Sequence, residues 1–381
     1  MKKGCYVGDI KDHDRIRGIF CVNSGRILKT KNGVPYLALT LMDKTGTIEA
    51  RLWDIPDTLK DVPASGSFLD IEAEAQSFRD SVQLKIDRIF PVNDMSDIPI
   101  EDFLPVTNAN RDALWARLKA IIKEVLDPTL RPLIDKIFST TGYKREFFRA
   151  PAGKQIHHAY LGGLLEHTVG VASLAIEVLK VYTHLDRNLL ISGALVHDLG
   201  KIKEFRYDAP PIDYTDEGRL LGHLVIGASL LDDISRVIGL DVNHPRILAL
   251  KHLVLSHHGE RDFGAAVEPM TEEAVILYLL DDMDAKINYM ASLRKELSET
   301  SVSSEDNSKR WTGFQRVMGR YLFLTPLERD RILLSHMLGK NTDSRQGNSL
   351  RSDIQRCPDG DLEGQPSLWS VRKAGDEPDS N

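Results

Sequence analysis

The stretch Ala194-Leu-Val-His-Asp-Leu-Gly-Lys201 sets an imidazole, His197, directly beside a carboxylate, Asp198, at the end of an apolar run. The run predicts a buried helix, and the glycine after the pair is typical of a helix end. Taken alone, the pair could also be a histidine at the end of a helix followed by a solvated aspartate. Its meaning therefore depends on which other residues share the same core.

Other residues of the kinds that bind metals lie in, or at the edge of, further apolar runs that predict helices. They are His167, His223, His257, His258 and Asp281. Each could be an ordinary core or helix-end residue. Burying so many ionisable groups in one core is costly unless they share a purpose, and metal binding is the usual one. Imidazoles combined with carboxylates suit Mn, Fe, Co, Ni or Zn, so the sequence predicts a metal site without choosing the ion.

The order His…His-Asp…His…His-His…Asp resembles the HD superfamily of metal-dependent phosphohydrolases. The resemblance implies an all-helical domain whose basic metal site uses a first histidine, the doublet and a late aspartate. These residues are His167, His197, Asp198 and Asp281. Members that hold a second metal add a further histidine and one or both of a His-His pair, which match His223, His257 and His258. The resemblance thus implies two divalent ions bridged by Asp198.

The last ligand has an alternative, because Asp284 lies three residues after Asp281 on the same expected helix face. Two ions held close together would polarise a phosphate and lower the pKa of a bound water, so Asp198 is also a candidate catalytic residue. Lys201 is the second, because its charge could offset the charge that develops on the phosphate. Alternatively, Lys201 is a solvated lysine at a helix end.

Longer runs within residues 157–168, 214–223, 255–260 and 281–288 look like those of YhaM-type 3'-5' exoribonucleases. These bacterial proteins join an N-terminal oligonucleotide-binding (OB) domain to an HD domain, and the resemblance covers both parts. It implies metal-dependent removal of nucleotides from a 3' end. Arg219 and His157 lie in these runs and are candidates to contact phosphate, with ordinary structural roles as the alternative.

The N-terminal residues have the period of strands. In the run 34–43 the leucines 37, 39 and 41 share one face, and the run 47–53 alternates in the same way. Two more strand-like runs lie near 68–75 and 81–89. About five short strands separated by turn residues predict a small barrel of the OB type. The expected fold is therefore multidomain, an all-β OB barrel followed by an all-α HD domain.

The same alternation predicts a surface for nucleic acid on the barrel. If the leucines fill the interior, the side chains that point outward are those of Tyr36, Arg51, Trp53 and Lys85. Exposed rings beside cations suit a single strand, because bases stack on rings and phosphates meet charge. The alternative is that Tyr36 and Trp53 are packing residues.

Composition and motifs together predict the domain boundaries. They are 1–92 for the OB domain, 93–154 for a linker and leading helices, 155–299 for the HD domain, 300–340 for C-terminal helices near 311–324 and 327–338, and 341–381 for a disordered tail. Three distant cysteines and the lack of a secretory or membrane-spanning run favour the cytoplasm. The formal net charge of -7 means that binding of polyanions needs a local patch or a metal site.

These observations predict a metal-dependent 3'-5' exoribonuclease that acts on single-stranded RNA. Single-stranded DNA is an alternative substrate, because no residue identifies a reader of the 2'-hydroxyl. Two other functions stay open. One is an HD phosphodiesterase or nucleotidase for a small nucleotide, and the other is a non-catalytic nucleic-acid-binding protein. The metal, the oligomeric state and the biological targets are not predicted.

Overall fold

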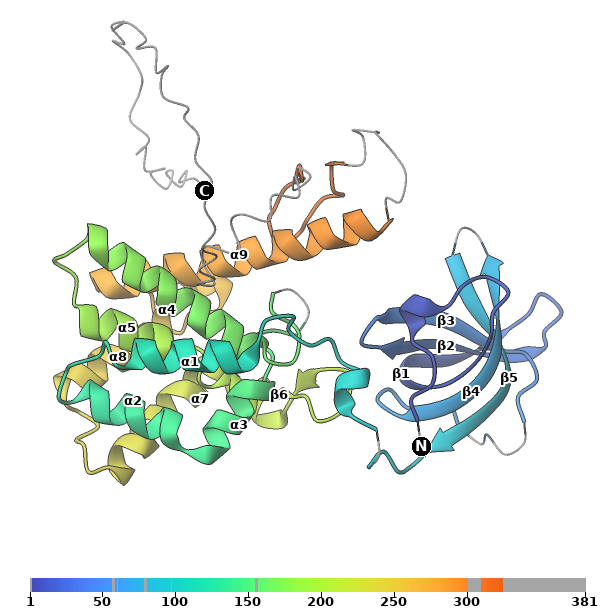
Figure 1. The fold of residues 1–381 in the computed structure, drawn as a ribbon, viewed down its shortest axis with the longest axis horizontal. Helices are drawn as coiled ribbons and strands as arrows, with labels where there is room; N and C mark the ends of the chain where they lie inside the picture. Colours follow the sequence, from blue (N-terminus) through green and yellow to red (C-terminus); the bar gives the residue numbers. More distant parts are fainter. Residues whose placement is uncertain are drawn as a thin grey trace, which may run out of the picture. The chain divides into compact units, whose positions relative to one another are not determined.

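The computed structural model describes residues 2–56, 59, 61–78, 81–96, 98–154, 157–300 and 310–324. For Phe263 and for residues 296–300 it describes the backbone alone. Within these ranges the chain forms a β-barrel followed by a helical domain (Figure 1). The expected fold, an OB-type barrel and then an all-helical HD domain, is confirmed.

Five strands close into the barrel in the order β1-β2-β3-β5-β4 (Figure 1). Their bounds are β1 Arg15–Lys29, β2 Pro35–Asp43, β3 Gly46–Leu52, β4 Phe68–Phe78 and β5 Ser81–Val92, and the short 3-10 helix η1 Val7–Asp9 precedes them. Only the β3–β5 pair is parallel. The long β1 pairs with both β2 and β4, and this closes the barrel.

Alternation in the sequence explains which side chains fill the barrel. Leu37, Leu39 and Leu41 are buried, as are the predicted inward residues Ile48 and Leu52 of β3. Because successive side chains of a strand point to opposite faces, the residues between them are left for the outer surface. The barrel therefore has a closed hydrophobic core, and the outward side chains of β2 and β3 include those of Tyr36, Thr40, Glu49 and Arg51.

The helical domain follows a connector that contains the 3-10 helix η2 Ile100–Asp102. Its further elements are α1 Arg111–Ile122, α2 Leu130–Ser139, α3 Thr141–Arg149, α4 Gly163–Val181, α5 Arg187–Val196, α6 Lys201–Glu204, β6 Phe205–Arg206, β7 Asp213–Tyr214, α7 Asp216–Val237, α8 Pro245–Ser256, η3 Arg261–Phe263 and α9 Glu272–Thr300. One continuous aliphatic cluster runs through these helices.

Helix α5 lies in the middle of this cluster and carries the His-Asp doublet at its end. Asp186 caps the helix by accepting a hydrogen bond from the backbone N–H of Leu189. Every residue from Leu189 to Val196 is buried, and α5 packs against α4, α8 and α9. A helix that is apolar on all sides belongs in a core, so the doublet that follows it is delivered into the interior.

One expectation about secondary structure was wrong. Residues 311–324 form no helix, since Trp311 bridges to Phe323 and Gln315 to Arg320 across a turn at Gly319, whose φ is 62°. Packing of the Trp311 and Phe323 rings across the bridge, with centroids 5.2 Å apart, overrides the helical spacing. Within the helical domain, β6 and β7 form a small two-stranded sheet.

The predicted helix at 327–338 and the predicted disordered tail lie outside the described residues. None of the helices that are described is both long enough and apolar enough to cross a bilayer.

Candidate metal centre

The helical domain brings its ligand-type residues together from five helices. His167 lies in α4, His197 and Asp198 directly follow α5, and His223 lies in α7. His257 and His258 follow α8, and Asp281 lies in α9. The three histidines at 167, 197 and 257 are fully buried, and Asp198 is 2% exposed. All seven residues that the sequence selected as metal ligands therefore converge on one interior site.

One group of atoms forms around the Nε2 atom of His167. That nitrogen lies 3.0 Å from Nε2 of His197, 3.4 Å from Oδ2 of Asp198 and 3.0 Å from Oδ1 of Asp281. His197 Nε2 lies 3.5 Å from the same Asp198 oxygen and 3.8 Å from the Asp281 oxygen. We call these four residues the first group.

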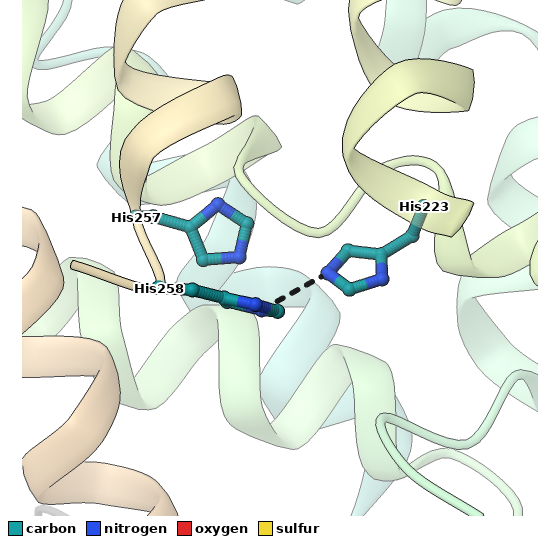
Figure 2. Close-up of side chains that lie close together, drawn as sticks. All are labelled: His223, His257 and His258. Carbon is teal, nitrogen blue, oxygen red and sulfur yellow. Dashed lines mark hydrogen bonds between the residues drawn. The ribbon is translucent and has the colours of Figure 1, made fainter. Parts of the chain in front are cut away.

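A second group forms on the other oxygen of Asp198. Its Oδ1 atom lies 3.5 Å from Nε2 of His223 and 3.5 Å from Nε2 of His257. His223 Nε2 is also 3.2 Å from Nε2 of His258, so that the three rings face one another (Figure 2). Asp198 thus contributes one oxygen to each group, which is the geometry of a bridging carboxylate.

The spacings within both groups are those of atoms that share an ion. Ligand atoms about 2.0–2.2 Å from one metal lie about 3–3.6 Å from one another in octahedral or tetrahedral arrangements. Three buried atoms of these residues also lack a hydrogen-bond partner within the described part of the chain, Oδ1 of Asp198, Nε2 of His257 and Nδ1 of His258. Buried polar atoms are rarely left unpaired, so the residues present fit divalent ions.

Backbone carbonyls set the orientation of two of the imidazoles. His197 directs Nδ1 to the carbonyl oxygen of Ala194 at 3.0 Å, and His257 directs Nδ1 to that of Val254 at 2.8 Å. A carbonyl only accepts, so each Nδ1 carries the proton and each Nε2 presents a lone pair to the centre.

Carboxylates orient two more of the five imidazoles. Asp284 Oδ2 lies 2.7 Å from Nδ1 of His167, and Glu204 Oε1 lies 2.9 Å from Nδ1 of His223. Asp284 therefore faces the outer nitrogen of His167, whereas Asp281 faces the inner one. This geometry favours Asp281 over Asp284 as the last ligand and gives Asp284 the place of a bracing carboxylate.

Two glycines let the chain form the second group. A Cβ atom on Gly200 would lie 2.0 Å from the backbone oxygen of His223, so only glycine permits the turn after Asp198 to approach α7 this closely. Gly222 has φ of 70° and ψ of 157°, which breaks α7 just before His223. The break frees the N–H of His223, which donates to Glu204 at 3.1 Å.

Charges in the centre hold one another in their ionised forms. Burial raises the pKa of Asp198, but Lys201 and His197 outweigh it and hold the pKa well below the usual range. Burial likewise lowers the pKa of His167, but its contacts with Asp198, Asp281 and Asp284 raise it well above the usual value. The carboxylates therefore stay negative, as an ion site requires.

Lys201 and His157 border the centre. Lys201 donates to Oδ2 of Asp198 at 2.7 Å and is buried, so the alternative of a solvated helix-end lysine was wrong. The ring of His157 lies 6.0 Å from that of His167. Burial first, and then the charge of Lys201, lowers the pKa of His157 to about 3, so this imidazole is neutral near pH 7.

Sequence reasoning missed the residues that brace the histidines. Glu204 stands in the run Lys201-Ile-Lys-Glu-Phe-Arg206, where charged and apolar residues are mixed, so nothing marked it out from the charged residues beside it. His158 is adjacent to the noted His157, and its Nε2 lies 2.9 Å from Asp284 while its Nδ1 lies 2.8 Å from the hydroxyl of Tyr160. A hydrogen-bond partner for the Nδ1 atom of each metal-binding histidine is expected in general, but the sequence does not show which residue supplies it.

The barrel gathers the predicted nucleic-acid residues on its outer surface. The rings of Tyr36 and Trp53 lie 4.7 Å apart, and the guanidinium of Arg51 lies 6.0 Å from the Trp53 ring. Lys85 is paired in register with Arg51, and the ring of Phe78, which sequence reasoning did not select, lies 5.4 Å from Arg51. Trp53 is 39% exposed, so it does not serve as core packing alone.

Comparison with known proteins agrees with both parts of the molecule. The HD domain family matches residues 164–286. The 3'-5' exoribonuclease YhaM of Bacillus velezensis is 32% identical over 292 residues, which are 76% of this chain and 90% of that protein. YhaM of Bacillus subtilis strain 168 is 34% identical, and YhaM of Bacillus pumilus is 35% identical, over 68% of this chain and 81% of each relative. The chain therefore belongs to the YhaM family of 3'-5' exoribonucleases.

Proposed function

We propose that this protein is a metal-dependent 3'-5' exoribonuclease that hydrolyses the phosphodiester bonds of single-stranded RNA. The observation that carries the proposal is Asp198, whose two oxygens face two separate groups of imidazoles. The barrel with its exposed rings and cations supports a single-stranded substrate. Incubating the purified protein with Mn, Co, Ni or Zn and 5'-labelled RNA tests the activity, its polarity and its metal requirement together. Single-stranded DNA and cyclic nucleotides serve as competing substrates.

Two divalent ions are the proposed cofactors, from among Mn, Fe, Co, Ni and Zn. His167, His197, Asp198 and Asp281 would hold one ion, and Asp198, His223, His257 and His258 the other. When bound, such ions polarise the phosphate and supply a hydroxide nucleophile near neutral pH.

The chain's own residues have separate tasks in this proposal. Asp198 holds both ligand groups in register. Lys201, with its ammonium 2.7 Å from Asp198 Oδ2, adds a fixed positive charge beside the place where the phosphate's negative charge develops. Arg219 lies four residues before His223 and is exposed, so we assign it a contact with the strand.

The barrel is the proposed holder of the strand. Tyr36 and Trp53 offer faces for bases, and Arg51 and Lys85 offer charge for phosphates. We propose the domain limits 1–92 for the OB domain, 93–154 for the linker and leading helices, and 155–299 for the HD domain. Residues 300–381 follow these domains. A cytoplasmic location is likewise a proposal, which rests on the cysteine usage.

Replacing Trp53 with alanine should weaken binding of a single-stranded oligoribonucleotide by about 1–3 kcal/mol, because one base loses its stacking partner. Turnover of a small chromogenic diester should fall far less, because that substrate needs no barrel to reach the ions. Fluorescence anisotropy and a colorimetric assay give the two values. Phe90→Ala is the matched control, since Phe90 is an exposed aromatic residue five positions from Lys85 along β5, about 17 Å away. Equal losses in both assays would instead mean that the barrel braces the metal centre.

The two bracing carboxylates should each affect one ion. Glu204→Gln should weaken the ion of the second group, and Asp284→Asn that of the first, each by about 10–100-fold, because the brace orients the ligating imidazole. Titration of the metal-free protein with Mn measures the two affinities. His223→Ala and His167→Ala identify which binding phase belongs to which group. The assignment would be wrong if Glu204→Gln and Asp284→Asn weakened the same phase.

A further inference from the structure

Four side chains form a compact cluster on β7 and the segments around it. Lys154 donates to Asp213 Oδ1 at 2.7 Å, and Arg219 donates to the same carboxylate at 3.1 and 3.2 Å. Lys154 Nζ lies 5.5 Å, and the guanidinium carbon of Arg219 5.9 Å, from the centre of the Tyr214 ring. We call Lys154, Asp213, Tyr214 and Arg219 the rim cluster. Its two cations share one carboxylate, which leaves a net positive charge beside an aromatic face.

The cations of the rim cluster stand on segments that lead into the metal centre. Lys154 precedes by three residues His157, whose ring lies 6.0 Å from that of His167. Arg219 precedes by four residues His223, a member of the second group. His157 is partly buried and His223 is 8% exposed, whereas His197 is fully enclosed. The cluster therefore joins two segments on the more open side of the centre.

Tyr214 is tied to the same place by the small sheet. It pairs with Phe205, the residue after Glu204, and the N–H of the next residue, Thr215, donates to the backbone oxygen of Glu204 at 2.9 Å. Glu204 in turn holds His223. Tyr214 is thus linked to His223 of the second group through one strand pair and the side chain of Glu204.

The ring of Tyr214 is supported from within the protein and open to solvent. Phe205, which is buried, lies 5.2 Å from it, while Tyr214 itself is 38% exposed. A backed, exposed ring flanked by cations is the arrangement that holds a base and its phosphates without reading the sequence. The ligands of the metal centre can engage a phosphate, but none of them offers an exposed aromatic face for the base.

We propose that the rim cluster binds the 3'-terminal nucleotide of the strand, with Tyr214 stacking on the base and Lys154 and Arg219 contacting the adjoining phosphates. The inference rests on the proposed nuclease function and assigns to it a site for the nucleotide that is released. Because stacking needs only a ring face, the site accepts all four bases. It requires a base, however, and so distinguishes a complete nucleotide from a ribose phosphate alone.

The test compares two 5'-labelled oligoribonucleotides that differ only at the 3' end, one with uridine and one with an abasic ribose. For the wild-type protein loaded with Mn, kcat/KM should be about ten-fold or more higher on the complete strand. Tyr214→Ala should process both strands with similar kcat/KM, whereas Tyr214→Phe should keep the discrimination because the ring stays. Tyr182→Ala, which removes an exposed tyrosine at the end of α4, is the matched control and should discriminate as the wild type does.

The outcomes separate this inference from the proposed function. If the wild type shortens neither strand, the proposed function is wrong. If it shortens both and Tyr214→Ala still discriminates, the function stands and the rim cluster is not the nucleotide site. A second measurement uses the wild-type protein alone, so the inference can still be tested if a variant does not fold. Uridine 5'-monophosphate should inhibit about ten-fold or more better than ribose 5-phosphate, and equal inhibition would overturn the inference.

Discussion

An Asp198→Ala variant should lose RNA hydrolysis by at least about three orders of magnitude, together with both bound ions. The reason is that one carboxylate serves both ligand groups, with Oδ2 3.4 Å from His167 and Oδ1 3.5 Å from His223 and His257. The remaining members of each group are mostly imidazoles, and in the neutral form that binds an ion these cannot replace the shared negative charge. Metal analysis by mass spectrometry and single-turnover hydrolysis of labelled RNA measure the two losses.

A control is needed because Asp198 also pairs with Lys201. Alanine at 198 leaves a buried ammonium without its partner, and breaking a buried ion pair typically costs about 3–5 kcal/mol of stability. The double variant Asp198→Ala/Lys201→Met removes both charges and should recover much of that stability, measured by urea unfolding, without recovering activity. Near wild-type turnover with unchanged metal content in Asp198→Ala would end the two-ion assignment.

Circular RNA should resist the enzyme while a linear RNA of the same sequence is shortened. The ligand atoms lie deep in the helical domain, with His197 fully buried and Asp198 2% exposed. A strand end can be fed into such a site, whereas an internal bond would have to bring two continuous arms of the chain with it. A linear RNA with a blocked 3' end should resist in the same way. A time course on a denaturing gel compares the three substrates.

The same gel shows the direction in which the enzyme digests the strand. The linear RNA labelled at its 5' end should give a ladder that shortens one nucleotide at a time, because the label stays on the shrinking strand. Early release of the label as a mononucleotide would show digestion from the 5' end. Fast internal cleavage of the circular RNA would show that the enzyme is an endonuclease and not an exonuclease.

Periodicity made much of this molecule predictable. Leucines recur at every second position, 37, 39 and 41, and this period of two indicated a strand with one face in the barrel interior. Likewise, a histidine inside an apolar run can be an ordinary core residue when taken alone, but His167, His223 and the other ligand-type residues stood out as a set. Patterns of this kind are visible in the sequence because burial in the folded protein requires particular residue types at these positions.

Features that depend on contacts between distant residues were not predictable. The choice between Asp281 and Asp284 turns on which nitrogen of His167 each one faces, and helical spacing treats the two residues alike. Glu204 acquires its importance from a break in α7 that only the folded chain shows. The segment 311–324 has helical spacing, but the pairing of Trp311 with Phe323 decides its shape.

The arrangement of the ligand groups also gives the ions a part in holding the chain together. His167 lies close to Asp198 and also to Asp281, 114 positions further along the chain, and His223 and His257 join α7 to the end of α8 through the other oxygen of Asp198. Together, one ion in each group would cross-link five helices. The protein's two described cysteines are both free. Ligands that bind only the folded state add about 2.7 kcal/mol of stability at a concentration one hundred times their dissociation constant. The supply of metal in the cell would then govern how long the folded enzyme survives, as well as how fast it works.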